Sequence, residues 1–265
     1  MTPPLEDFHV HTTFCDGKNT AEEMVLAAID RGLTRLGFSG HAHMPFDDGC
    51  AMSPEATDAY RREVSRLREE YRDRIEIFCG IEQDFFSDVT AEGYDYVIGS
   101  VHSLRIGGEY LSVDESGETF RRAVSEHFDG DALSFAEEYF RLAAQVVERT
   151  GADLIGHFDL VTKFNEGGCF FDENHPRYIA ASNAALDALL RTGRPFEINT
   201  GAVSRGYRRS PYPGLRILRR IAERGGRVIL SSDSHRSDTL CFQFAEAQAL
   251  AESVGLKVER FQAGK

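Results

Sequence analysis

The stretch RVILSSDSH, residues 227–235, combines the two features on which the fold and the site depend. A short run of aliphatic and β-branched residues, typical of a buried strand, is followed at once by Asp233 and His235. The stretch DFHVHT, residues 7–12, likewise ends in a pair of polar side chains, here two histidines. Because side chains at i and i+2 of a strand point to the same side, each stretch aims two polar groups in one direction.

Similar apolar runs recur along the chain and alternate with amphipathic helical patterns. This alternation indicates a parallel sheet with crossover helices, and seven or eight such units favour a closed α/β barrel over an open doubly wound sheet, the alternative. We expect a single domain over residues 1–265. The predicted strands span 7–12, 35–39, 76–80, 95–101, 153–157, 195–199 and 227–231, with a further candidate at 257–261, and the predicted helices span 21–31, 54–71, 135–149, 175–191, 213–223 and 238–253.

Composition excludes several classes of protein. The formal net charge of −13 argues against a nucleic-acid-binding surface, which needs clustered Lys and Arg. Apolar runs are far shorter than the roughly 20 residues that span a bilayer, and residues 1–7 lack the basic start and apolar run of a signal peptide. Five scattered cysteines without a CxxC pair favour neither disulfides nor a cysteine-based zinc site. We therefore expect a cytoplasmic protein with a small-molecule partner, of open oligomeric state.

The longer connections at residues 107–130 and 165–175 are rich in Gly, Asp and Glu. Loops of this length in a compact barrel are often lids or binding loops, and the sequence leaves open which of them acts as a lid.

Metal-binding side chains follow nearly every predicted strand. In a barrel the loops after the strands share one face, so groups far apart in sequence converge there. The candidate ligands are His9, His11, Asp16, His41, Glu82, His102, His157, Asp233 and His235.

The number and kind of these side chains indicate more than one metal ion. Imidazole and carboxylate ligands suit Zn²⁺, Mn²⁺ and Fe²⁺, and nine candidates exceed the four that satisfy one tetrahedral zinc. We expect two to three divalent transition-metal ions. A lone histidine at a strand end is usually an ordinary residue, but seven of the nine histidines fall at predicted strand ends. Asp16 with Gly17 is also a good turn, and His43 is either a pocket residue or a bystander beside His41.

A loop that carries positively charged side chains is predicted on the same face as the candidate metal ligands. Residues 197–205 run from a strand into a loop that ends in Arg205, whose planar guanidinium suits bidentate phosphate recognition. The alternative is a solvated loop arginine. Further cations nearby are Lys163, Arg208 and Arg209, whereas Glu197 and Asn199 are expected inside the barrel or behind the ligands.

Taken together, the motifs resemble the PHP (polymerase and histidinol phosphatase) superfamily over almost the full length of the chain. The motifs are HVHT at 9–12 with Asp16 and Gly17 downstream, GHAH at 40–43, GIE at 80–82, GSVHS at 99–103, GHFD at 156–159 and SDSH at 232–235. The stretch EINTG followed by SRGY, at 197–207, is similar to the histidinol-phosphatase branch of that superfamily.

The resemblance implies a distorted (β/α)7 TIM-like barrel with three metals. One metal would be held by His9, His11, Glu82 and Asp233, a second by Asp16, His41 and His235, and a third by Glu82, His102 and His157, with Glu82 bridging. Gly40 departs from the family pattern, which has Asp before the histidine of the second motif.

We therefore predict a metal-dependent phosphomonoester hydrolase in which a metal-activated water attacks phosphorus and Arg205 stabilises the phosphoryl charge. The proton donor to the leaving group is metal-bound water or His43. One rival is an amidohydrolase, which would want a bridging lysine where His102 stands. The other is a non-catalytic metal-binding domain, against which the complete ligand set argues.

The resemblance implies L-histidinol phosphate as the substrate, in histidine biosynthesis, with another small phosphomonoester or nucleotide as the competitor. The leaving group carries an ammonium and an imidazole, so acidic or aromatic groups should lie beyond the metals. The candidates are Asp47, Asp48, Glu109, Asp114 and Phe164.

Overall fold

The computed structural model describes residues 5–46 and 49–263, and within them seven parallel strands form one sheet in chain order. The bridge between Val10 and Ser234 joins the two edges of this sheet, so the barrel is nearly closed. The predicted α/β barrel is confirmed. Its strands are β1 (Glu6–Asp7), β2 (Arg35–Phe38), β3 (Glu76–Asp84), β4 (Tyr96–Ser100), β7 (Leu154–Ile155), β8 (Phe196–Asn199) and β9 (Val228–Ser231).

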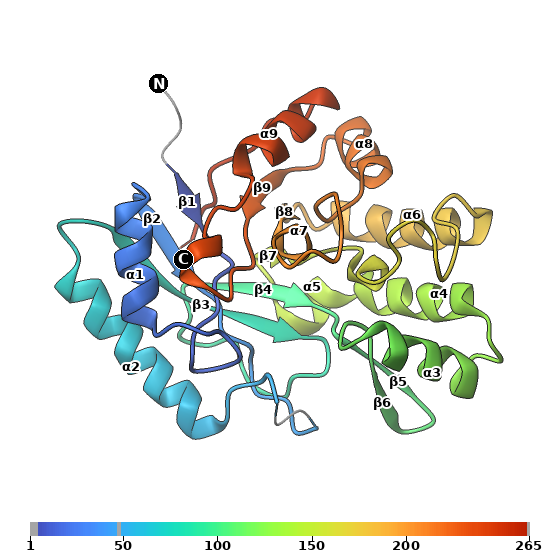
Figure 1. Cartoon of the computed structure of the whole chain (residues 1–265), viewed down its shortest axis with the longest axis horizontal. Helices are drawn as coiled ribbons and strands as arrows, with labels where there is room; N and C mark the ends of the chain where they lie inside the picture. Colours follow the sequence, from blue (N-terminus) through green and yellow to red (C-terminus); the bar gives the residue numbers. More distant parts are fainter. Residues whose placement is uncertain (1–4, 47–48, 264–265) are drawn as a thin grey trace.

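Helices cover the outside of the barrel, with α1 and α2 on one side and α4, α6 and α8 on the other (Figure 1). Thr20 and Glu23 form a capping box at the start of α1, and Gly151 ends α5 in the left-handed conformation. None of the described helices is long and apolar enough to cross a membrane. Apart from α3, described below, the α-helices in the described residues are α1 (Ala21–Asp30), α2 (Pro54–Glu70), α4 (Ala132–Ala143), α5 (Val146–Thr150), α6 (Pro176–Leu190), α7 (Gly201–Ser204), α8 (Leu215–Glu223) and α9 (Phe244–Ser253).

A tyrosine fills the interior of the barrel. The hydroxyl of Tyr96 donates to the carbonyl oxygens of Phe8 and Phe38 at 2.8 and 2.9 Å. Its ring lies so close to Gly37 and Gly80 that a Cβ at either position would overlap with it. Only glycine fits at these two positions, because the Tyr96 side chain approaches the backbone too closely for a Cβ. Because this aromatic side chain occupies the interior, the polar side chains that could bind a ligand lie at the carboxyl ends of the strands.

The segment 107–130, predicted as a loop, is largely folded, and that prediction is wrong. It contains part of an antiparallel hairpin, β5 (Ser103–Ile106) and β6 (Glu109–Ser112), and the helix α3 (Gly117–His127). Burial against the body of the protein stabilises both, since Leu104, Phe120 and their apolar neighbours are buried. Figure 1 shows β5, β6 and α3 together at one side of the barrel. The segment 165–175 is an irregular connection, as predicted.

Several predicted elements differ in extent; the strand expected at 7–12, for example, is only the two-residue β1. The helix expected at 135–149 is two helices, α4 and α5, separated by a tight turn at Ala144 and Gln145. The helix expected at 238–253 begins only at Phe244, because Cys241 and Gln243 have left-handed backbone angles. The candidate strand at 257–261 makes only an isolated bridge, between Val258 and Val228. There the chain places Phe261 against the aromatic cluster inside the barrel.

Candidate metal centre

The structure brings all nine predicted ligand residues together at the carboxyl-terminal rim of the barrel; we call them the rim donors. His9 and His11 follow β1, and Asp233 and His235 follow β9. The remaining strands contribute His41 after β2, Glu82 within β3, His102 after β4 and His157 after β7, and the turn after His11 contributes Asp16.

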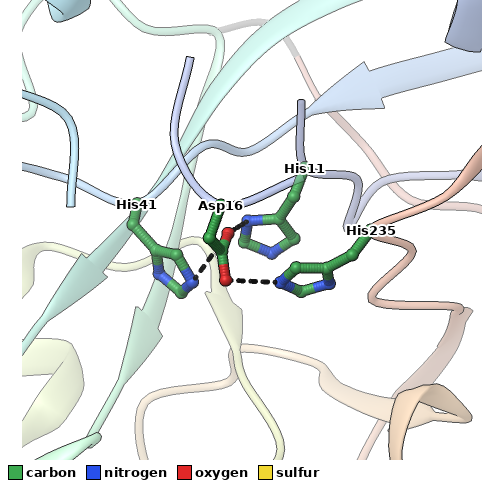
Figure 2. A group of neighbouring side chains, drawn as sticks. All are labelled: His11, Asp16, His41 and His235. Carbon is green, nitrogen blue, oxygen red and sulfur yellow. Dashed lines mark hydrogen bonds and ion pairs between the residues drawn. The ribbon is translucent and has the colours of Figure 1, made fainter. Parts of the chain in front are cut away.

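The side chains of His11, Asp16, His41 and His235 form one group in which possible ligand atoms lie within 4.8 Å of one another. Figure 2 shows the Asp16 carboxylate between the three imidazoles, with its Oδ2 at 3.1 Å from His235 Nε2. The backbone N–H of Gly17 donates to Thr12 at 3.0 Å, and this tight turn points Asp16 back at the strand. Asp16 is thus both a turn residue and a member of the cluster.

Glu82 lies at the centre of the remaining donors. Its Oε2 is 3.1 Å from His9 Nε2 and 3.1 Å from His41 Nδ1. Its Oε1 is 2.9 Å from His157 Nε2 and 3.3 Å from His102 Nε2. The side chain is 1 % exposed, so one buried carboxylate contacts imidazoles from four different strands. A carboxylate in this position can bridge two cations.

The groups around Glu82 and Asp233 favour the negatively charged form of both carboxylates. Burial alone would raise the pKa of Glu82, but His9, His102 and His41 hold it well below its usual range. Burial would likewise raise the pKa of Asp233, which Arg205 and His9 keep well below its usual range. Burial opposes a charge on His9 and His102, yet nearby carboxylates raise the pKa of both well above the usual value. Either protons or metal cations can balance this charge, and the two compete for the same atoms.

His11 differs from the other imidazoles. Burial, together with His235 and His41, lowers its pKa to about 3, so it is neutral and able to donate a lone pair.

Several buried atoms of the rim donors make no hydrogen bond to any residue that the structure describes. Buried polar atoms are nearly always paired, so a group of such atoms facing one another points to a missing partner. Nitrogen and oxygen donors together fit a divalent transition metal. The atoms that face the other rim donors in this way are His9 Nε2, His11 Nε2, Asp16 Oδ1 and Glu82 Oε2.

Buried polar residues hold the rim donors from behind. Glu197, predicted inside the barrel, is fully buried and lies 2.8 Å from His9 Nδ1, while Asn199 donates to its other oxygen at 2.8 Å. Asp84 was not predicted. Its carboxylate accepts from the backbone N–H of His102 at 2.7 Å and lies 3.4 Å from the ring nitrogen Nδ1. Its position two residues after Glu82 on one strand was the available signal.

A cavity of about 700 Å³ opens above the rim donors. Its floor includes Asp16, Glu82, His157 and Asp233, and β6, the adjoining turn and α3 form a wall. The described residues of this wall that line the cavity, here called the hairpin wall, are Tyr110, Leu111, Ser112, Asp114, Glu115, Thr119, Arg122, Ala123, Glu126 and His127.

Arg205 lines this cavity beside the rim donors. Its guanidinium donates to the Asp233 carboxylate and to the Asp233 carbonyl oxygen, both at 2.9 Å, and lies 3.1 Å from His235 Nδ1. The side chain remains 29 % exposed, so an anion in the cavity can reach it. Lys163 lines the same cavity and forms an ion pair of 3.0 Å with Asp114.

Two other residues singled out in the sequence lie elsewhere. His43 is outside the described lining of the cavity, and its Nδ1 contacts the Asp88 carboxylate at 3.1 Å. Arg208 is also outside that lining; its guanidinium donates to the Thr162 carbonyl oxygen at 2.7 Å. The geometry therefore gives no support to His43 as a proton donor or to Arg208 as a phosphate contact.

The candidates for leaving-group recognition are only partly in the cavity. Asp114 lines it, whereas Glu109 is outside the described lining and pairs with His127 at 3.4 Å. Phe164 packs against Tyr207 with ring centroids 5.3 Å apart. Asp47 and Asp48 fall outside the residues that the structure describes.

The PHP domain family model matches residues 7–201, which is well over half of the chain. The chain belongs to the PHP domain family. The histidinol-phosphatase of Bacillus subtilis is 27% identical over 261 residues, which cover 90% of this chain and 96% of the relative. The histidinol-phosphatase of Lactococcus lactis is 26% identical over 265 residues, which cover 94% of this chain and 91% of the relative.

Two solved structures share the fold of this chain. A protein of Listeria monocytogenes matches with a TM-score of 0.77 at 20% identity, over 91% of this chain and 99% of its own. The histidinol phosphate phosphatase of Lactococcus lactis, in complex with zinc, L-histidinol and phosphate, matches with a TM-score of 0.68 at 21% identity, over 98% of both chains. Both likenesses agree with the predicted TIM-like barrel.

Proposed function

We propose that this PHP domain is a phosphoric monoester hydrolase that converts L-histidinol phosphate and water to L-histidinol and phosphate in histidine biosynthesis. The observation that carries the proposal is the convergence of nine imidazole and carboxylate side chains on one rim, below a cavity that also holds Arg205. The names of the relatives from Bacillus subtilis and Lactococcus lactis supply the substrate. A cytoplasmic location remains part of the proposal.

We further propose two to three divalent ions, Zn²⁺, Mn²⁺ or Fe²⁺, on the rim donors. Following the family pattern, His9, His11, Glu82 and Asp233 would hold one ion, Asp16, His41 and His235 a second, and Glu82, His102 and His157 a third. The groups of neighbouring donors in the structure overlap with this division, but one of them also contains His11 together with Asp16. When bound, such ions supply Lewis acidity toward the phosphoryl oxygens and an activated water. Asp84 and Glu197 fix the orientation of the imidazoles.

Arg205 and Lys163 bind the phosphoryl group in this proposal. Both lie in the cavity with the rim donors, and both are paired with carboxylates that keep them in place. Their positive charges face the position where negative charge accumulates on the equatorial oxygens. The planar guanidinium of Arg205 can donate two parallel hydrogen bonds to phosphate.

The hairpin wall suits a leaving group with a cationic end. In that wall Glu115 and Glu126 bring two carboxylates to the cavity beside the guanidinium of Arg122, and Asp114, paired with Lys163, adds a third. Tyr110 adds an aromatic face and stacks on Phe46 with ring centroids 3.6 Å apart. An imidazole and an ammonium are both accommodated by such surroundings.

A panel of phosphate esters and amides, assayed with and without a chelator, separates this proposal from its rivals. We expect hydrolysis of phosphomonoesters only, and its loss when metal is removed. Cleavage of amides would indicate an amidohydrolase, and inactivity on both classes a non-catalytic domain.

The substrate is tested by comparing kcat/KM for histidinol phosphate with that for nucleoside monophosphates and sugar phosphates. We expect a preference of at least about a hundredfold, equivalent to about 2.7 kcal/mol of transition-state binding. A smaller preference would reject histidinol phosphate and leave the phosphoesterase assignment intact.

A further inference from the structure

The barrel has a seam between its first and last strands. β1 contains two residues and shares no ladder with β9 in the described chain; a single bridge joins Val10 to Ser234. At this bridge the N–H of His11 donates to Ser234 at 2.8 Å, and the N–H of Ser234 donates to His9 at 3.0 Å. Four of the rim donors, two from each end of the chain, face each other across this weakly paired seam.

The Asp7 carboxylate spans the same seam. Asp7 is fully buried, and its Oδ1 accepts from the backbone N–H of Ser232 at 3.1 Å. Its Oδ2 accepts from the Ser232 hydroxyl and from the backbone N–H of Cys241 at 3.1 Å. The side chain therefore replaces the missing ladder hydrogen bonds and fixes both ends of the loop that carries Asp233 and His235.

Asp233 needs such support because of its backbone. Its φ is +50°, in the left-handed region that non-glycine residues rarely adopt. Such a conformation persists only when the surrounding structure determines it, and Ser232, the preceding residue, is held by Asp7 through two hydrogen bonds. Burying a carboxylate costs free energy unless it is fully hydrogen-bonded, and an apolar side chain could fill the same space without that cost. The hydrogen bonds of Asp7 therefore indicate a role beyond packing.

We propose that Asp7 is a positioning residue that sets Asp233 and His235 opposite His9 and His11, and so fixes the metal-binding distances across the seam. The inference rests on the proposed metal site, not on the identity of the substrate. It concerns a residue that contacts the backbone of the site rather than the reacting atoms.

The test uses Asp7→Asn in the full-length chain, with Asp153→Asn as the matched control. The amide keeps the shape of Asp7 but turns one acceptor into a donor that faces existing N–H or O–H donors. Asp153 is also largely buried and also links two strands, accepting from Val97 N–H at 3.2 Å and from Arg194 at 3.0 Å. It precedes β7 and so lies at the end of the barrel opposite the rim donors.

Zn²⁺ affinity of the metal-stripped proteins, measured by competition with a chelator, is the main readout, with thermal unfolding beside it. We expect Asp7→Asn to weaken at least one Zn²⁺ site by about 10–100-fold, with activity recovered at saturating Zn²⁺. Asp153→Asn should lower the Tm without changing Zn²⁺ affinity.

Wild-type Zn²⁺ affinity in Asp7→Asn would overturn the proposal, and so would an equal loss of affinity in Asp153→Asn. If Asp7→Asn does not fold, Ser232→Ala removes only the hydroxyl bond to Asp7 and should still lower Zn²⁺ affinity measurably; unchanged affinity there also rejects the proposal. A wild-type protein that binds no Zn²⁺ would reject the metal site itself. Zn²⁺ binding without hydrolysis of histidinol phosphate would reject only the substrate.

Discussion

The rim donors and the hairpin wall face each other across one cavity but differ in how they are held. His9, His11 and Glu82 are almost completely buried, and each is held by contacts to other strands. In the hairpin wall, by contrast, Glu115, Arg122 and Glu126 are exposed. The rim is part of the barrel, whereas the wall is an insertion between β4 and α4.

This difference suggests that the rim donors carry out the hydrolysis and that the hairpin wall selects the substrate. Metal ligands must be held to within a fraction of an ångström, which a closed ring of parallel strands achieves. An inserted hairpin and helix can change residues without moving those ligands, so the leaving group can vary while the hydrolytic chemistry persists. Changes in the rim should therefore abolish turnover of every ester, and changes in the wall should alter the preference among esters.

The largest effect is expected in the rim. His11→Ala or Asp233→Ala removes a side chain that faces several other donors, so metal content should fall and turnover of all phosphate esters should disappear. Elemental analysis and activity assays measure both, and circular dichroism should show an intact helical signal. Full metal content with full activity in either variant would show that the replaced residue is needed neither for metal binding nor for hydrolysis.

Arg205→Ala should have the next largest effect. Removing one charged donor to the phosphoryl group should cost about 2–4 kcal/mol of transition-state stabilisation, measured from kcat/KM, and should weaken inhibition by inorganic phosphate. Metal content should not fall, because the change frees the Asp233 carboxylate. Arg205→Lys serves as the control, since it keeps the charge but not the planar fork. If kcat/KM is unaltered in Arg205→Ala, Arg205 does not contact the phosphoryl group, and of the two proposed contacts only Lys163 remains.

Gly80→Ala tests the rigidity of the barrel below the rim. The added Cβ would overlap with the buried Tyr96 ring, so we expect a loss of about 1–3 kcal/mol in the free energy of unfolding. Gly117→Ala in α3 is the matched change near the hairpin wall, where the added Cβ makes only ordinary contacts. It should leave stability within about 0.5 kcal/mol of the wild type. If denaturant titrations show an equal loss of unfolding free energy in both variants, the barrel interior is not more tightly packed than the region near the hairpin wall.

The smallest effect is expected in the hairpin wall. Glu126→Gln should lower kcat/KM for histidinol phosphate by about two- to fivefold, because an exposed ion pair is weak. The rate with p-nitrophenyl phosphate, whose leaving group has no cation, should be unchanged. Glu118→Gln, on the same helix but outside the described lining of the cavity, is the control. A similar decrease with both esters would show that Glu126 does not recognise the leaving group.

The sequence was sufficient to predict the barrel and to bring all nine rim donors to one face. Strand periodicity is local, and parallel strands share the orientation of their ends, so His9 and Asp233 could be placed near each other without coordinates. The donors were placed on the correct face even where the predicted strand length was wrong. For example, β3 was expected to stop at Gly80, yet it continues through Glu82 to Asp84.

The hairpin wall and the supporting contacts were not predicted, because they depend on tertiary packing. Gly107 and Gly108 suggested a loop, and burial of Leu104 and Phe120 against other helices decides that the segment folds. The pairing of Asp7 with Ser232 joins residues 225 positions apart. No local pattern in the sequence marks such a contact.

The most direct test of the account is elemental analysis of the purified protein, followed by metal removal and stepwise return of Zn²⁺, Mn²⁺ or Fe²⁺ with activity measured at each step. Nine donors on one rim predict two to three ions per chain, loss of phosphatase activity in the stripped protein, and recovery as the ions return. Full phosphatase activity in a preparation without metal would contradict the account.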